Sequence, residues 1–159
     1  MQPVVPVEPF EPVVPVVPVV QAGQVARVSA TPAALALISR LADKHGPVMF
    51  HQSGGCCDGS APMCFARGEF LVGDQDVLLG EIGGQPFYIG GAQFEYWRHT
   101  HLIIDVVPGR GGMFSLEGPE GVRFLTRSRL YTDAESRQLE SQPLQIGPAA
   151  TTTATAAAL

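Results

Sequence analysis

The chain has 159 residues, a net charge of −5, and 45% hydrophobic against 16% charged residues. This length suits one domain with tails, and the apolar fraction excludes disorder throughout. The acidic balance argues against a general nucleic-acid binder, because neutralising phosphates requires a basic face. No run of about 18 apolar residues occurs, so a membrane-spanning helix is not expected.

Both ends of the chain have a biased composition. Residues 1–29 are rich in proline and valine, with proline at every third position from Pro3 to Pro18, which matches the three-residue turn of polyproline II. Residues 143–159 are mostly alanine and threonine and have no periodic apolar face. We therefore predict disordered tails at both ends. The proline segment is either a low-complexity extension or a ligand for a proline-reading module.

The first regular element has clear start and stop signals. Thr31 suits the N-cap, Pro32 suits the first helical position, and Gly46 follows His45 as a stop signal. Apolar residues recur at helical spacing between them. We expect a helix of about three turns here.

The rest of the domain reads as strands separated by glycine and proline turns. The predicted strands are 48–51, 69–72, 77–82, 86–89, 94–107, 113–117 and 122–131. A short surface helix over 132–142 is expected from the capping-box spacing of Thr132 and Glu135. The prediction is an α+β domain over 30–131, with a strand-rich mixed or antiparallel sheet and one N-terminal helix packed on it.

The last predicted strand alternates between apolar and basic residues. One face would carry Val122, Phe124 and Leu130, and the other Arg123, Arg127 and Arg129. The arginines form either a solvated strand face or a surface for an acidic partner.

The strongest candidate for chemistry is the segment Gly54-Gly55-Cys56-Cys57-Asp58-Gly59. A disulfide between adjacent cysteines is strained, so vicinal thiols more often bind a metal, react as thiolates or stay reduced. The flanking glycines let a ligand approach the backbone closely. Cys64 is a third candidate, although core packing explains a lone cysteine adequately. An odd number of cysteines does not suit a secreted disulfide framework and favours the cytoplasm.

Three histidines are candidate metal ligands or bases. His99 and His101 stand two apart on a predicted strand and would face one side, and His51 directly precedes the cysteine segment. Imidazoles together with thiolates suit zinc or iron. We predict that at least one of these rings lies within about 3 to 5 Å of a Cys56 or Cys57 sulfur.

Three stretches, 48–59, 114–117 and 124–129, resemble a bacterial family of domains of unknown function. Its members are small proteins often encoded beside aldehyde dehydrogenases, and the likeness spans roughly residues 31–132. The resemblance implies an accessory role, with an aldehyde dehydrogenase as a partner. More distantly, a helix, a strand and then Gly54-Gly55-Cys56 resemble the opening of the HesB-like iron–sulfur assembly fold. That fold also uses a Cys-x-Cys near its carboxyl end, whereas this chain has no cysteine after Cys64.

Three functions remain open from the sequence. The first is an accessory protein, possibly for an aldehyde dehydrogenase, that uses the vicinal cysteines to bind a metal or a thiol. The second is a small thiol-dependent enzyme acting on aldehyde or thiol adducts, with Cys56 or Cys57 as nucleophile and a histidine as base. The third is a structural domain with packed cysteines. An aldehyde dehydrogenase itself is excluded, because the chain is too short for its two domains.

Overall fold

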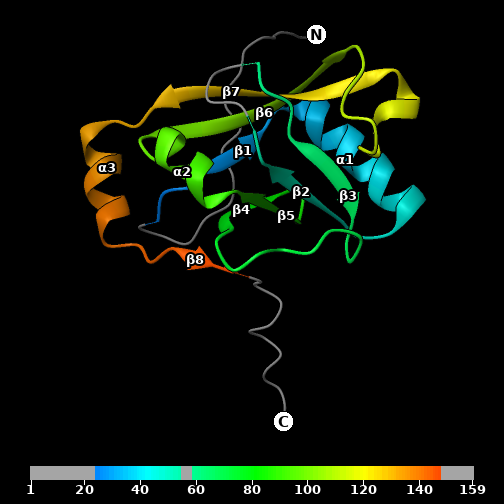
Figure 1. Cartoon of the computed structure of the whole chain (residues 1–159). Coiled ribbons are helices and arrows are strands. Elements are labelled where there is room, and N and C mark those ends of the chain that lie inside the picture. The colour runs from blue at the N-terminus through cyan, green and yellow to red at the C-terminus, as the bar shows by residue number, and fades with distance from the viewer. Residues whose placement is uncertain (1–23, 55–58, 148–159) are drawn as a thin grey trace, which may run out of the picture.

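The computed structural model describes residues 24–54 and 59–147, which form three helices, a short 3-10 helix and eight strands (Figure 1). In chain order the elements are β1 (Val28–Ala30), α1 (Pro32–His45), β2 (Val48–Gln52), β3 (Met63–Ala66), β4 (Val77–Ile82), β5 (Gln85–Ile89), α2 (Gly91–Trp97), β6 (Thr100–Pro108), η2 (Gly118–Glu120), β7 (Val122–Leu130), α3 (Asp133–Glu140) and β8 (Gln145–Ile146).

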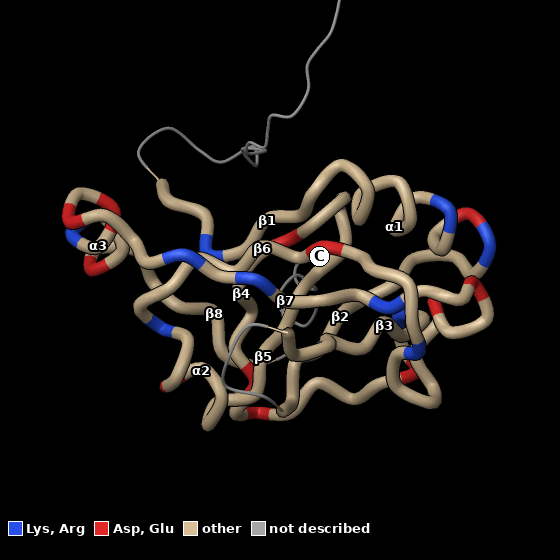
Figure 2. The backbone as a smooth tube through the Cα atoms, turned by 90° about the horizontal axis from the view of Figure 1, so that it is seen from above, with Lys and Arg blue, Asp and Glu red and all other residues tan. Residues whose placement is uncertain are grey.

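The strands form two sheets. A three-stranded sheet has the order β1-β6-β7, and a five-stranded sheet has the order β3-β2-β5-β4-β8. Both are mixed, because β1 runs parallel to β6 and β2 runs parallel to β5, whereas the other neighbours are antiparallel. Figures 1 and 2 place α1 at one end of the sheets and α2 and α3 at the other. The predicted α+β class, with a mixed sheet and a packed N-terminal helix, is confirmed.

Helix α1 begins and ends at the residues that the sequence predicts. The Thr31 side chain accepts a hydrogen bond from the Ala34 amide, and Gly46 ends the helix with a positive φ of 82°. A non-glycine residue would be strained in that conformation. The apolar stripe of the helix, including Leu37 and Leu41, is buried. Burying this stripe, rather than intrinsic propensity, supplies most of the stability of a short helix.

Aromatic rings fill the space between the sheets. The Phe50 ring on β2 stacks on Phe87 of β5 at 5.9 Å between centroids and meets Phe124 of β7 edge-on at 5.1 Å. All three side chains are fully buried. Such pairs add about 0.5 to 1.5 kcal/mol beyond the area they bury, so this cluster joins the two sheets firmly.

Two predicted strands were wrong, and a third was predicted to begin too early. Residues 69–72 form no strand, and 113–117 form turns that lead into η2. The predicted strand 94–107 begins only at Thr100, because α2 occupies the preceding residues. Phe94 and Trp97 are three residues apart and both buried, which is the spacing of a helix face. As a result, His99 precedes β6 instead of lying on it.

The ends of the folded region extend beyond the predicted domain. Strand β1 includes Val28 and Ser29, which the sequence grouped with the N-terminal tail, and β8 pairs with β4 beyond the predicted surface helix. The capping box at Thr132 is present, and α3 follows it as predicted. Residues 1–23 and 148–159 of the two predicted tails lie outside the described residues.

The basic face of β7 is largely paired within the protein (Figure 2). Arg127 contacts Asp105 at 3.0 Å, and Arg129 contacts Glu135 at 2.8 and 2.9 Å. Arg123 donates to the Gly59 carbonyl at 3.3 Å. These contacts favour the solvated-face interpretation over a surface for an acidic partner. The predicted alternation fails at Leu130, which is exposed at the end of the strand, and at Leu125, which is buried on the face of the arginines.

Candidate functional site

The vicinal cysteines belong to the connection between two paired strands. Strands β2 and β3 are antiparallel, with Phe50 opposite Cys64 and His51 opposite Met63. Cys56 and Cys57 themselves lie outside the described residues. The predicted distance between a histidine ring and their sulfurs therefore stays a prediction. The stems of this connection, hereafter the cysteine hairpin, are well defined.

Both stems of the cysteine hairpin are attached to one residue of the facing sheet. The Thr126 hydroxyl on β7 donates to the Gln52 side-chain carbonyl at 2.8 Å. On the other stem, the Gly59 amide donates to the Thr126 carbonyl at 2.9 Å, and the Thr126 amide donates to the Ser60 carbonyl at 2.8 Å. Gln52 and Thr126 are almost completely buried. The two ends of the segment that carries the vicinal cysteines are thus fixed relative to the core.

Cys64 lies beneath the hairpin and is fully buried. Its amide donates to the Ser115 hydroxyl at 2.8 Å, and its carbonyl accepts from the Leu116 amide at 3.0 Å. Burial, reinforced by the nearby Glu117 carboxyl, raises the pKa of the Cys64 thiol far above its usual value. Because the thiolate is the form that attacks or binds metal, this environment favours a protonated, packed thiol.

Glu117 is a buried acid that the sequence reasoning did not single out. The Ser115 hydroxyl donates to one carboxyl oxygen, and the Phe124 amide donates to the other at 3.4 Å. Burial raises the pKa of this carboxyl, while the two hydrogen bonds lower it in part. The only signal in the sequence was indirect, since Ser115 and Glu117 fall in one of the three stretches of family resemblance.

His51 points to the opposite face of β2 from Phe50 and Gln52. One ring nitrogen, Nε2, lies 2.9 Å from an Asp76 carboxylate oxygen, and the ring packs against Phe70 at 4.5 Å between centroids. Its other nitrogen, Nδ1, is buried and has no hydrogen-bond partner. Asp76 is in turn held by the Gly73 amide at 2.8 Å. A carboxylate therefore orients this imidazole, a pairing that the sequence spacing did not reveal.

The other two histidines lie on the three-stranded side. His101 is buried on β6, with Nδ1 2.9 Å from the Ala26 carbonyl and Nε2 2.7 Å from the Ser29 hydroxyl. Burial lowers the pKa of His101, so the neutral ring donates to the carbonyl and accepts from the hydroxyl. His99 is exposed between α2 and β6.

The histidines and Cys64 do not converge within the part of the chain that is described. No group of three or more His, Cys, Asp or Glu side chains there is arranged to hold a metal ion. His51 and His101 belong to different sheets. Cys56 and Cys57 lie outside this part of the chain.

These features define a small α+β domain with a thiol-bearing hairpin. The family model described as "Domain of unknown function (DUF779)" matches residues 37–130, which is more than half of the chain. The chain therefore belongs to this family. The match includes both stems of the cysteine hairpin as well as Cys64, Glu117 and Thr126. No curated protein matches the chain. None of the described helices is long and apolar enough to cross a membrane.

Proposed function

We propose that this protein is a non-catalytic accessory protein whose Cys56 and Cys57 bind a metal ion or a thiol-reactive partner. The observation that carries the proposal is the attachment of both hairpin stems to Thr126. Fixed stems lower the entropic cost of presenting two adjacent thiols in one geometry. The flanking glycines leave room for a ligand to approach the backbone.

Zinc or iron suits the metal form of this proposal. A structural zinc site takes four ligands, of which the vicinal cysteines supply two. A neighbouring side chain or a bound partner would supply the others. Iron–sulfur carriage, as in the HesB-like likeness, is a narrower version in which Cys56 and Cys57 again act as thiolate ligands.

An aldehyde dehydrogenase is the partner that we propose. The support is the family resemblance, whose members are often encoded beside these enzymes. Within this proposal, the dehydrogenase would contact the segment that carries Cys56 and Cys57. A pull-down with an aldehyde dehydrogenase from the same organism tests the partner directly, and lack of binding under reducing conditions contradicts it.

Metal analysis of protein purified under reducing conditions tests the metal form. We expect zinc or iron to be bound or taken up by the unmodified chain and by Cys64→Ala, in which the vicinal pair is intact. The Cys56→Ser, Cys57→Ser double variant should lose the metal. A metal-free chain that takes up neither zinc nor iron would exclude the metal form. Normal stability and partner binding in the double variant would favour a structural domain with packed cysteines.

The contact between His51 and Asp76 favours a second candidate, a thiol-dependent enzyme acting on aldehyde or thiol adducts. A carboxylate-oriented imidazole is the usual base for a cysteine nucleophile. This function requires a thiolate with a lowered pKa, so Cys56 or Cys57 should be alkylated faster than a free thiol below about pH 8. His51→Gln should abolish that excess rate. If no cysteine reacts faster than a free thiol, the enzyme hypothesis fails.

A further inference from the structure

A short segment covers the face of the five-stranded sheet that carries His51. Residues 68–73, hereafter the Phe70 loop, lie between β3 and β4 (Figure 1). His51 on β2 and Phe65 on β3 project from the sheet face opposite Phe50. The centre of the Phe70 ring lies 4.5 Å from that of the His51 ring and 4.8 Å from that of the Phe65 ring. The loop therefore places one aromatic side chain over the imidazole.

The covered imidazole has one ring nitrogen without a hydrogen bond. The side chain of His51 is 6% exposed, and its Nε2 lies 2.9 Å from an Asp76 carboxylate oxygen. A carboxylate only accepts hydrogen bonds, so Nε2 carries the ring proton and Nδ1 keeps a lone pair. Nδ1 is buried and has no hydrogen-bond partner. Exposing the ring would let Nδ1 accept a hydrogen bond, which offsets part of the cost of opening.

The Phe70 loop is weakly attached to the rest of the protein. Its residues are exposed apart from Phe70 and Val72, which are half-buried. Within the described part of the chain, the hydrogen bonds of the loop backbone reach only Ala66 and Asp76, which lie just outside its two ends. Leu71 is 89% exposed and adds no apolar anchor. Few buried side chains and few hydrogen bonds to the core are typical of segments that open locally.

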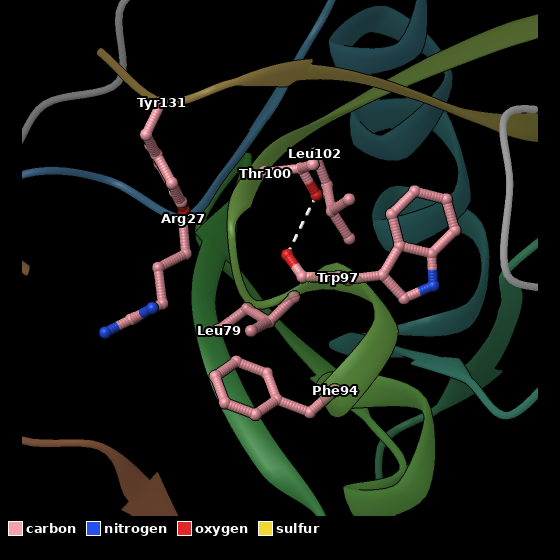
Figure 3. A pocket seen from close by; sticks show the side chains of 7 residues that line it. All are labelled: Arg27, Leu79, Phe94, Trp97, Thr100, Leu102 and Tyr131. Atoms are coloured by element: carbon pink, nitrogen blue, oxygen red, sulfur yellow. Dashed lines mark hydrogen bonds between the residues drawn. The ribbon is translucent and has the colours of Figure 1, made fainter. Parts of the chain in front are cut away.

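The connection from α2 into β6 is held more firmly. There, Phe94 and Trp97 are both buried, and the Thr100 hydroxyl donates to the Trp97 carbonyl at 2.8 Å (Figure 3). Leu79 and Leu102 lie beside these side chains. By contrast, no fully buried side chain anchors the Phe70 loop.

A glycine stands at each end of the Phe70 loop. Gly68 has a φ of 99°, which only glycine adopts without strain. The Gly73 amide donates to the Asp76 carboxylate at 2.8 Å, and the Asp76 amide donates to the Gly73 carbonyl at 3.1 Å. Small residues at the ends of a loop are common hinges. The turn at Gly73 would keep Asp76 beside His51 while the preceding residues move.

We propose that the Phe70 loop is a lid that opens about Gly68 and Gly73 and controls access to the Nδ1 atom of His51. In the closed form, the Phe70 ring shields the imidazole. In the open form, Asp76 still orients the ring, and Nδ1 meets solvent as an acceptor or base. A small molecule that donates a hydrogen bond then reaches this nitrogen. The inference concerns access to the imidazole alone and does not depend on the vicinal cysteines.

Acylation of the four histidines with diethyl pyrocarbonate, mapped by mass spectrometry in the folded full-length chain, tests the lid. His45 and His99 are exposed and should react fastest. His101 is buried with both ring nitrogens hydrogen-bonded, so it should react only when the chain unfolds. His51 should react at least about tenfold faster than His101 and at least about tenfold slower than His45, because lid opening limits it. A rate equal to that of His101 or of His45 would overturn the proposal.

Two neighbouring variants separate lid opening from a general loosening of the fold. Phe70→Ala removes the shielding ring and should raise the His51 acylation rate at least about tenfold, with the His101 rate unchanged. Leu71→Ala is the matched control, because this exposed side chain shields nothing, and it should leave the His51 rate unchanged. If Phe70→Ala fails to fold, the rates in the unmodified chain decide. Equal acceleration of His51 and His101 in Phe70→Ala, or no acceleration of His51, would contradict the lid.

Discussion

The buried polar groups at the two ends of the molecule differ in how completely they are hydrogen-bonded. Beneath the cysteine hairpin, Gln52, Thr126, Ser115 and Glu117 are hydrogen-bonded to one another or to the backbone. At the other end, the buried Tyr131 oxygen makes no hydrogen bond of normal geometry, and the same is true of His51 Nδ1 on the opposite face of β2. Satisfied polar groups stabilise and position a framework, whereas a buried polar group without a partner costs free energy. The hydrogen-bonded framework beneath the hairpin therefore holds both stems of the segment that carries Cys56 and Cys57 against the core.

The largest expected effect comes from crowding Glu117. A Cβ at Gly111 would lie 2.6 Å from a Glu117 carboxyl oxygen and 3.3 Å from the Arg123 Cβ. Gly111→Ala should lower the free energy of unfolding by about 3 kcal/mol, the upper end for overpacking, because both neighbours are held in place. Chemical denaturation measures this. Gly118→Ala, where a Cβ meets nothing within 4 Å, should change it by less than about 0.5 kcal/mol. An equal loss of unfolding free energy in the two variants would show that the Glu117 side chain is not held in place.

Removing one hydroxyl from each end tests the comparison itself. Thr126→Val should lower the free energy of unfolding by about 1 to 2 kcal/mol, because it leaves the buried Gln52 carbonyl without its donor. Tyr131→Phe should leave it unchanged within about 0.5 kcal/mol or raise it, because the hydroxyl that it removes makes no hydrogen bond of normal geometry. Denaturant titration of both variants is sufficient. A larger loss of unfolding free energy in Tyr131→Phe than in Thr126→Val would contradict this comparison of the two ends.

The smallest effect is a dependence of stability on pH. Burial raises the pKa of Glu117 in the folded state above its usual value of 4.5. The protonated carboxyl therefore stabilises the fold fully below pH 4.5, and this stabilisation is lost as the pH rises through the raised pKa. Glu117→Gln removes this titration. The free energy of unfolding of the unmodified chain, relative to Glu117→Gln, should therefore fall as the pH rises above 4.5. A difference that stays constant over this range would mean that the Glu117 pKa is not raised.

The sequence predicted the elements whose signals are local. Helix α1 and the capping box of α3 matched, since each depends on residues a few positions apart. The strand predicted over 94–107 failed at its start, because the three aromatic residues Phe94, Tyr96 and Trp97 fit a short helix as well as a strand. Residues 113–117 were misassigned because their apolar side chains Met113 and Phe114 are exposed, which no pattern in the sequence indicates.

The candidate sites depended on contacts that are remote in sequence. His51 and Asp76 are 25 positions apart, and Gln52 and Thr126 are 74 apart. Their pairing follows from the register of the sheets, which composition and spacing do not specify. Arg27 fell in the predicted tail and so escaped attention, although its guanidinium lies over the Phe94 ring. Sequence reasoning identified residue types with the right chemistry, but it could not say which of them meet.

The central claim is that Cys56 and Cys57 are the functional thiols and that Cys64 is a packed core residue. Alkylation of the native chain with iodoacetamide, mapped by mass spectrometry, tests it most directly. Because Cys64 is fully buried and its thiol pKa is raised, it should be modified only after denaturant unfolds the chain, whereas Cys56 and Cys57 should be modified in the native state. Modification of native Cys64 as fast as the vicinal pair would contradict the account.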